Sequence, residues 1–271
     1  PRAIIICLAG RTWVATHRLD PYKDLARISD TQAIDADVEP LEVYVVSLDW
    51  KWLFIYPEYN IATVNEVAAV VDRPVEFKLT SVTVMNAFYV PDLAGMIYAM
   101  AGMETELNAV INVPGTYEGF SANYSGNGFS YMNFDFLGLS EEDFAGWVSD
   151  VQDQGRAAEL DQPAYNQLQQ PSIDHKVMYF GSVQDGLWRR IVNLCAGQQD
   201  LCLDDMMMVD ALGGGGIEGL FNREMFRGIC SAEDPGAFIA ILRPDLKERQ
   251  DELFAAMDLP PQPSLAQQLP R

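Results

Sequence analysis

The feature that most constrains the fold is a continuous run of strand-forming residues at positions 41–58, LEVYVVSLDWKWLFIYPE. Its valines, aromatic residues and isoleucine suit the pleated, half-buried surface of a sheet. We predict a β-strand in which Trp50 and Trp52, two residues apart, lie on the same face. An apolar sheet face has to be covered by another layer, so a two-layer β domain is expected.

Shorter strand-like runs follow up to residue 137. ATVNEV, VEFKLTSV and NAFYV alternate as strands, and Arg73-Pro74 marks a turn between the first two. Short apolar runs separated by glycine and by Pro114 continue the pattern. Residues 41–137 are therefore predicted to form one Greek-key β-sandwich, which makes the chain mainly β.

Five methionines lie within this region, and the four between residues 85 and 103 raise the question of copper binding. Copper-carrying methionine motifs are usually exposed and accompanied by histidine, whereas the β region of this chain contains no histidine. Methionine is also a flexible filler of hydrophobic cores. We therefore expect core packing for Met85, Met96, Met100 and Met103.

A glycine-rich segment at residues 115–132, GTYEGFSANYSGNGFSYM, lies between two strand-like runs. Its glycines permit tight turns and close backbone approach. Together with the upstream segment VMNAFYVP at residues 84–91, it resembles the copper loop of subunit II of the haem–copper oxidases. In that family the pattern C-S-E-x-C-G-x-x-H-x-x-M holds a dinuclear copper centre, CuA. The matching positions in this chain are Asn86, Ser121, Asn123, Ser125, Phe129 and Met132.

Only Met132 keeps the residue that the copper-binding members have. A dinuclear copper centre requires thiolates to bridge the ions and imidazoles to complete the coordination. Ser121 and Ser125 offer neutral hydroxyls, Asn86 an amide, and Phe129 no donor. The one remaining thioether, that of Met132, cannot hold copper without the other ligands. We expect neither a metal nor another cofactor in this chain. A copper-type loop without its ligands resembles subunit II of the cytochrome bo-type ubiquinol oxidases, the quinol-oxidising branch of the family. This resemblance implies a cupredoxin-like β-sandwich.

The first residues resemble part of a membrane helix. The apolar run is shorter than the about 20 residues that span a bilayer, and Arg11 interrupts it. TWVATHRLDP resembles the exit of the second transmembrane helix of bo-type subunit II, which would place Trp13 in the interfacial aromatic belt. We expect residues 1–18 to be the C-terminal part of a transmembrane helix and residues 19–40 to be a linker.

Beyond the sandwich, residues 138–195 are predicted to form a helical appendage. Ser140 is a candidate N-cap, and the acidic residues that follow it suit the positive end of a helix dipole. Phe144, Trp147, Val148 and Val151 recur at helical spacing and predict one apolar face. A face around Trp188 is expected to pack on the sandwich or on a partner. Residues 196–271 are assigned to a C-terminal extension.

Charge and cysteine content limit the functions further. The chain carries 18 basic and 39 acidic side chains, a formal net charge of −21, which disfavours binding to nucleic acid. Its cysteines form no C-x₂-C pair, so a metal cluster is not expected. Cys195 and Cys202 can close a small loop if the compartment is oxidising. Cys7 lies in an apolar stretch and is expected to be a buried free thiol.

The resemblance implies a non-catalytic, copper-free subunit II of a proton-pumping ubiquinol oxidase. In that family the haems, copper and quinol site lie in subunit I, so ubiquinol is the substrate of the complex and no catalytic residue is expected here. The implied partners are subunit I, the other oxidase subunits and membrane lipids. The implied location is the bacterial inner membrane, with the cupredoxin-like domain on the periplasmic side.

Two other functions remain open at this point. A CuA or blue-copper electron-transfer protein would need cysteine and histidine ligands, and residues 41–137 contain neither. A membrane-tethered binding module would need no particular ligands, but it would not explain why a copper-type loop is kept without its ligands.

Overall fold

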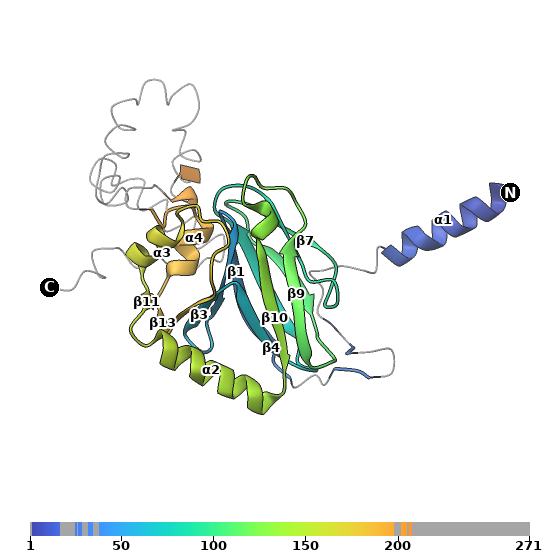
Figure 1. Ribbon diagram of the computed structural model, residues 1–271. Helices are drawn as coiled ribbons and strands as arrows, with labels where there is room; N and C mark the ends of the chain where they lie inside the picture. Colours follow the sequence, from blue (N-terminus) through green and yellow to red (C-terminus); the bar gives the residue numbers. More distant parts are fainter. Residues whose placement is uncertain are drawn as a thin grey trace, which may run out of the picture. The chain divides into compact units, whose positions relative to one another are not determined.

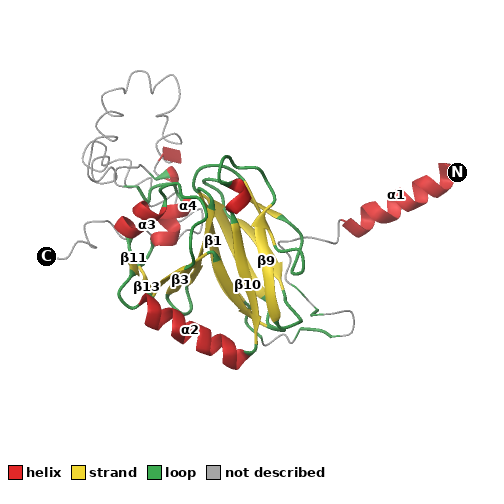
Figure 2. Ribbon diagram, in the orientation of Figure 1, coloured by secondary structure: helices red, strands yellow, loops and turns green. Residues whose placement is uncertain are grey.

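The computed structural model describes residues 2–16, 25, 27, 28, 32–34, 38–197, 202–204, 206 and 207. Contacts divide the chain into two units, Pro1–Val192 and Asn193–Arg271. Figure 1 shows the order of the elements along the chain, and Figure 2 shows that strands dominate the first unit.

Two sheets make up the predicted sandwich. The first has the strand order β12-β3-β2-β1-β5-β8 and the second the order β4-β10-β9-β6-β7. The pairs β1–β5 and β4–β10 are parallel and the other pairs in these sheets are antiparallel, so the connections cross over as in a Greek key. The first sheet comprises β1 (Leu41–Leu48), β2 (Lys51–Tyr56), β3 (Ile61–Val64), β5 (Val75–Ser81), β8 (Thr105–Ala109) and β12 (Met178–Phe180). The second comprises β4 (Glu66–Val70), β6 (Asn86–Tyr89), β7 (Ile97–Ala99), β9 (Gly115–Ser121) and β10 (Asn133–Leu139). The predicted fold class is confirmed.

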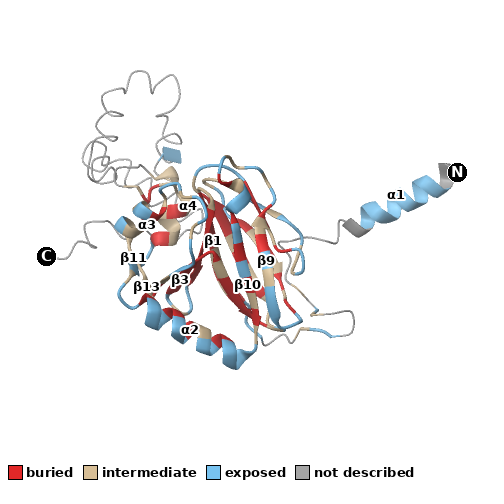
Figure 3. Ribbon diagram, viewed as in Figure 1, coloured by how far each residue is buried: buried red, intermediate tan, exposed pale blue. Residues whose placement is uncertain are grey.

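An aromatic cluster joins the two sheets. Phe88 and Phe134 stack with ring centroids 5.2 Å apart, and Trp52 from the opposite sheet meets both edge-on at 5.5 and 5.8 Å. Such pairs add to the free energy that the rings already gain from burial. Figure 3 shows many of the buried residues on the strands of the two sheets.

The run at residues 41–58 forms a hairpin rather than one strand. Leu48 pairs with Lys51, which leaves Asp49 and Trp50 as a two-residue turn. Trp50 has a φ of 66°, in the left-handed region. The prediction that Trp50 and Trp52 share a strand face is therefore wrong: Trp52 lies in the core, whereas Trp50 lies in the turn.

Helices α2 (Glu141–Gly155), α3 (Gln162–Leu168) and α4 (Leu187–Val192) follow, with a short parallel pair, β11 (Glu159–Leu160) and β13 (Ser182–Val183). Ser140 caps α2, because its side chain accepts a hydrogen bond from the Asp143 N–H at 3.1 Å. Phe144, Val148 and Val151 are buried, as the helical spacing predicts. Trp188 stacks on Tyr44 of β1 at 4.5 Å, so α4 packs on the sandwich.

The predicted membrane segment corresponds to α1 (Arg2–Thr16). Its described apolar side chains are exposed, and so is Cys7, contrary to the expected burial of that thiol. Within the described ranges, no helix reaches the length and apolar character that crossing a membrane requires. Most of the linker at residues 19–40 lies outside the described residues.

The second unit contains a disulfide. The sulfurs of Cys195 and Cys202 are 2.00 Å apart. Most of the extension at residues 196–271 lies outside the described residues.

The end of α2 depends on two facing glycines. A Cβ added to Gly155 would lie 2.3 Å from the Gly181 nitrogen, whereas one added to Gly146 of the same helix would meet nothing within 4 Å. We expect Gly155→Ala to lower the free energy of unfolding by about 1–3 kcal/mol through overpacking. The matched Gly146→Ala should raise it by about 0.5–1 kcal/mol, because alanine is the better helix former. Urea unfolding of both variants measures this, and equal effects would contradict the packing of α2.

Candidate functional site

The six positions of the copper-type loop are brought together by the segments next to β6 and between β9 and β10. The Ala122 N–H donates to the Ala87 carbonyl at 2.9 Å, and the Asn123 amide donates to the Met85 carbonyl at 2.9 Å. The Ser121 N–H donates to the Met132 carbonyl at 3.3 Å. The two segments therefore meet at one end of the sandwich, as the resemblance implies.

Asn86 and Ser121 form a buried polar pair. The Ser121 hydroxyl donates to Asn86 Oδ1 at 2.9 Å, and both residues are almost inaccessible. Asn86 Nδ2 donates to the Val84 carbonyl at 3.2 Å. Because buried polar groups are costly when unpaired, this pairing satisfies both side chains without a ligand.

The remaining loop positions are also packed or hydrogen-bonded within the chain. Met132 is fully buried and joins the hydrophobic core, with its sulfur 3.9 Å from the Ser125 hydroxyl oxygen. Phe129 opens the short 3₁₀-helix η1 (Phe129–Tyr131) and its ring lies 5.6 Å from that of Tyr124. Met132 thus fills the core, as methionine commonly does, without needing a metal.

Trp50 supports the loop from the β1–β2 turn, a role that sequence reasoning missed. Its indole N–H donates to the Ser125 carbonyl at 3.1 Å. A Cβ on Gly128 would lie 2.4 Å from the indole ring, so glycine is required where the loop crosses Trp50. Gly126 also faces the Trp50 ring. The spacing of the glycines in the loop was therefore the sequence signal that could have indicated this contact.

Lys51, the residue after Trp50, ties the same turn to the appendage. Its buried Nζ donates to the Gln170 carbonyl at 2.8 Å and to the Ser172 hydroxyl at 2.6 Å. Burial lowers the pKa of the Lys51 amine, and the negative charge of Asp49 opposes this shift. The segment around residues 170–172 is therefore part of the support for the loop.

The chemistry of the loop does not suit a CuA centre. Two hydroxyls, two amides, a phenyl ring and a buried thioether supply no thiolate and no imidazole. Across the described residues, no group of three or more His, Cys, Asp or Glu side chains is placed to hold a metal ion. No step of electron transfer through copper follows from this arrangement.

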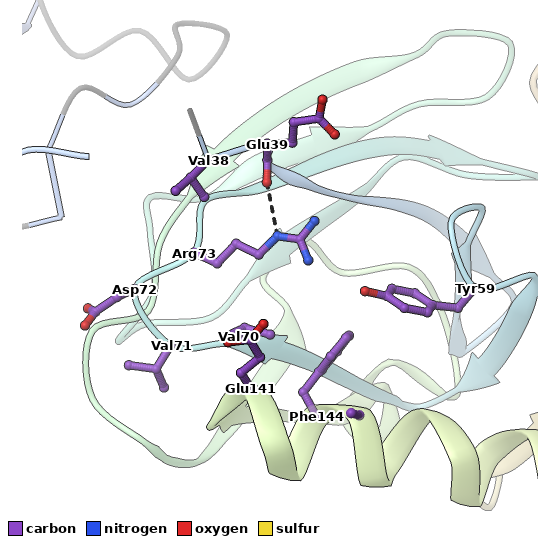
Figure 4. A pocket seen from close by; sticks show the side chains of 10 residues that line it. Val38, Glu39, Tyr59, Val70, Val71, Asp72, Arg73, Glu141 and Phe144 are labelled. Atoms are coloured by element: carbon purple, nitrogen blue, oxygen red, sulfur yellow. Dashed lines mark hydrogen bonds between the residues drawn. The ribbon is translucent and has the colours of Figure 1, made fainter. Parts of the chain in front are cut away.

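A separate cavity of about 690 Å³ lies beside the start of α2 (Figure 4). Arg73 lines it, but the Arg73 guanidinium is paired with Glu58 at 3.3 Å and donates to the Glu39 carbonyl at 3.1 Å. Its other charged lining residues, Glu39, Asp72 and Glu141, are exposed. The cavity is therefore a surface hollow that presents no buried, unpaired polar group.

Comparison with known proteins supports the resemblance found in the loop. A protein-family model described as the COX Aromatic Rich Motif matches residues 155–199. Ubiquinol oxidase subunit 2 of Acetobacter aceti is 47% identical over 192 residues, which cover 71% of this chain and 59% of the relative. Cytochrome bo(3) ubiquinol oxidase subunit 2 of Pseudomonas aeruginosa is 46% identical over 192 residues, covering 71% of this chain and 55% of the relative.

The chain thus spans less than two thirds of the length of these relatives. Among solved structures, the periplasmic domain of subunit II of cytochrome oxidase from Bradyrhizobium japonicum is 20% identical. It has a TM-score of 0.40 and covers 43% of this chain and 94% of its own. The two sequence relatives confirm the predicted resemblance to subunit II of the ubiquinol oxidases.

The buried pair gives a direct test of the loop geometry. Ser121→Ala removes the donor to Asn86 Oδ1, so we expect the free energy of unfolding to fall by about 1–3 kcal/mol. Ser130→Ala, at an exposed position in the same loop, should change it by less than about 0.5 kcal/mol. Urea unfolding of both variants measures the difference, and equal stabilities would show that the pair does not form.

Proposed function

We propose that this chain is the extramembranous part of a copper-free subunit II of a proton-pumping ubiquinol oxidase, together with the end of its membrane anchor. In this proposal subunit I carries the haems, the copper and the quinol site. The chain contributes no catalytic group and supports the assembly and stability of the complex. Its place is the bacterial inner membrane, with the sandwich on the periplasmic side.

The observation that carries this proposal is a retained loop with replaced ligands. The loop keeps its glycines, its Met132 and its support from Trp50, while Asn86 and Ser121 satisfy each other inside the protein. A domain that passed electrons through copper would require the ligand side chains, because the scaffold alone cannot bind the metal. Identity of 46–47% to two ubiquinol oxidase subunits supports the same assignment.

The implied partners are subunit I, the other oxidase subunits and membrane lipids. The exposed apolar side chains of α1 favour a lipid or protein environment for that helix. Isoleucine and tryptophan side chains that stay in water forgo the favourable free energy that burial would give them. Of the two other functions, a CuA or blue-copper protein would need cysteine and histidine ligands that residues 41–137 do not contain, and no described feature favours a binding module over the oxidase subunit.

A non-catalytic role predicts how a loop variant should behave in the complex. Ser125→Ala combined with Met132→Leu should leave ubiquinol oxidation per mole of assembled haem unchanged, because neither side chain takes part in the reaction. Any effect should appear in the amount of complex assembled, since a core methionine replaced by leucine costs less than about 1.5 kcal/mol. Turnover that falls while the amount of complex stays constant would contradict the non-catalytic role.

The loop should accept the missing copper ligands if the alignment is correct. We expect the variant with Asn86→His, Ser121→Cys, Asn123→Glu, Ser125→Cys and Phe129→His, with Met132 kept, to give a coloured dinuclear centre on adding copper. Thiolate-to-copper absorption and electron paramagnetic resonance measure this. The unaltered chain should show no such absorption, because Ser121 and Ser125 supply no bridging sulfur.

Partial ligand sets provide the control for that experiment. A variant with only one of the two cysteines should fail, because one thiolate cannot bridge two ions in this geometry. If the complete set folds but binds copper only at scattered mononuclear sites, the six positions do not converge as the loop requires, and the alignment with CuA is wrong.

A further inference from the structure

The methionines that were expected in the core are mostly on the surface. The exposed fractions of Met85, Met96 and Met103 are 41%, 46% and 52%, and Met100 is half-buried. The core-packing prediction is therefore wrong for the three exposed residues. Exposed thioethers near one another are unusual enough to need a separate explanation, since methionine is usually buried.

The sheet register pairs the residues that adjoin two of these methionines. Asn86 of β6 pairs with Ala99 of β7, and both residues are buried on the core side. Met85 precedes Asn86 and Met100 follows Ala99, so in this antiparallel ladder the two methionines flank the same end of the pair.

Met103 joins them through a tight turn. Its N–H donates to the Met100 carbonyl at 3.3 Å, and Gly102 between them has a φ of 71°. A hydrogen bond between residues three apart brings the two ends of a turn within about 7 Å of each other. Met85, Met100 and Met103 therefore come from two segments that meet at one place.

The backbone around these three residues is held by hydrogen bonds. The Ser81 hydroxyl donates to the Val84 carbonyl, and the Ser81 N–H donates to the Met100 carbonyl at 3.3 Å. Thr80 Oγ1 also donates to the Met100 carbonyl, at 3.2 Å. With the Asn123 amide on the Met85 carbonyl, both segments are anchored to the sandwich, which reduces the entropy that a ligand would have to overcome.

We propose that Met85, Met100 and Met103 form a three-thioether site for Cu(I). Thioethers are soft, neutral ligands that select Cu(I) over the harder divalent ions. Three of them match the low coordination number of that ion, and the net charge of −21 attracts any cation to the surface. The site uses no cysteine and no histidine, and it lies beside the vestigial CuA positions rather than on them. It does not depend on the proposed function.

The test is an anaerobic titration of the full chain with Cu(I) in competition with a chromogenic Cu(I) chelator. Cys7→Ser combined with Cys230→Ser is used as the background, because a cysteine thiol outside the Cys195–Cys202 disulfide would itself bind the ion. We expect one Cu(I) per chain. Adding Met85→Leu and Met103→Leu should weaken the affinity by about tenfold or more, since two of three ligands are lost.

Met96→Leu is the matched control. Met96 is about as exposed as Met85 and Met103 and directly precedes β7, but it is four residues from Met100, about 13 Å along an extended chain. Its replacement should leave the Cu(I) affinity unchanged. Leucine is close to methionine in volume, so both variants should stay folded, which thermal unfolding checks.

The methyl resonances of the methionines give a second readout. With Ag(I) as a diamagnetic substitute for Cu(I), three methionine methyl signals should shift, and the Met85→Leu and Met103→Leu variants identify two of them. No retained Cu(I), or equal affinity in the double variant, would overturn the proposal. Shifts confined to other methionines, such as Met206 and Met207, would overturn it as well.

Discussion

The contact between Trp52, Phe88 and Phe134 is the constraint on which the rest of this structure depends. It joins the two sheets, and it also fixes the loop, because Phe88 follows Asn86 by two residues and Phe134 follows Met132 by two. A Cβ on Gly119 would lie 2.1 Å from the Phe134 ring, so β9 can approach this cluster only with glycine at position 119. The position of the loop is therefore set by the core, independently of any metal.

This arrangement explains how a copper-type loop can persist without copper. In a metal site the ion holds the segments together, whereas here hydrogen bonds and packing do so. Ser121 and Asn86 pair with each other, Met132 joins the core, and Trp50 holds the Ser125 carbonyl. The scaffold remains useful as a rigid end of the sandwich, which is what a structural subunit of an oxidase would require.

Much of the fold could be predicted from local patterns, but the register could not. Strand-forming runs and the Ser140 cap predicted the sandwich and α2, because these signals are local in sequence. The hairpin turn at Trp50, the exposure of Met85 and Met103, and the contacts of Lys51 depend on which strands pair and in which register. The six loop positions were found by resemblance to a family, whereas their hydrogen bonds, which depend on residues up to 75 positions apart, became visible only in the structure.

The most direct test of the central claim is the electron donor used by the native complex that contains this chain. Oxygen consumption by the purified complex should be driven by ubiquinol and not by reduced cytochrome c. Electron paramagnetic resonance of the same sample should show no mixed-valence dicopper signal, because the loop has no bridging thiolate. Oxidation of cytochrome c accompanied by that signal would contradict the account.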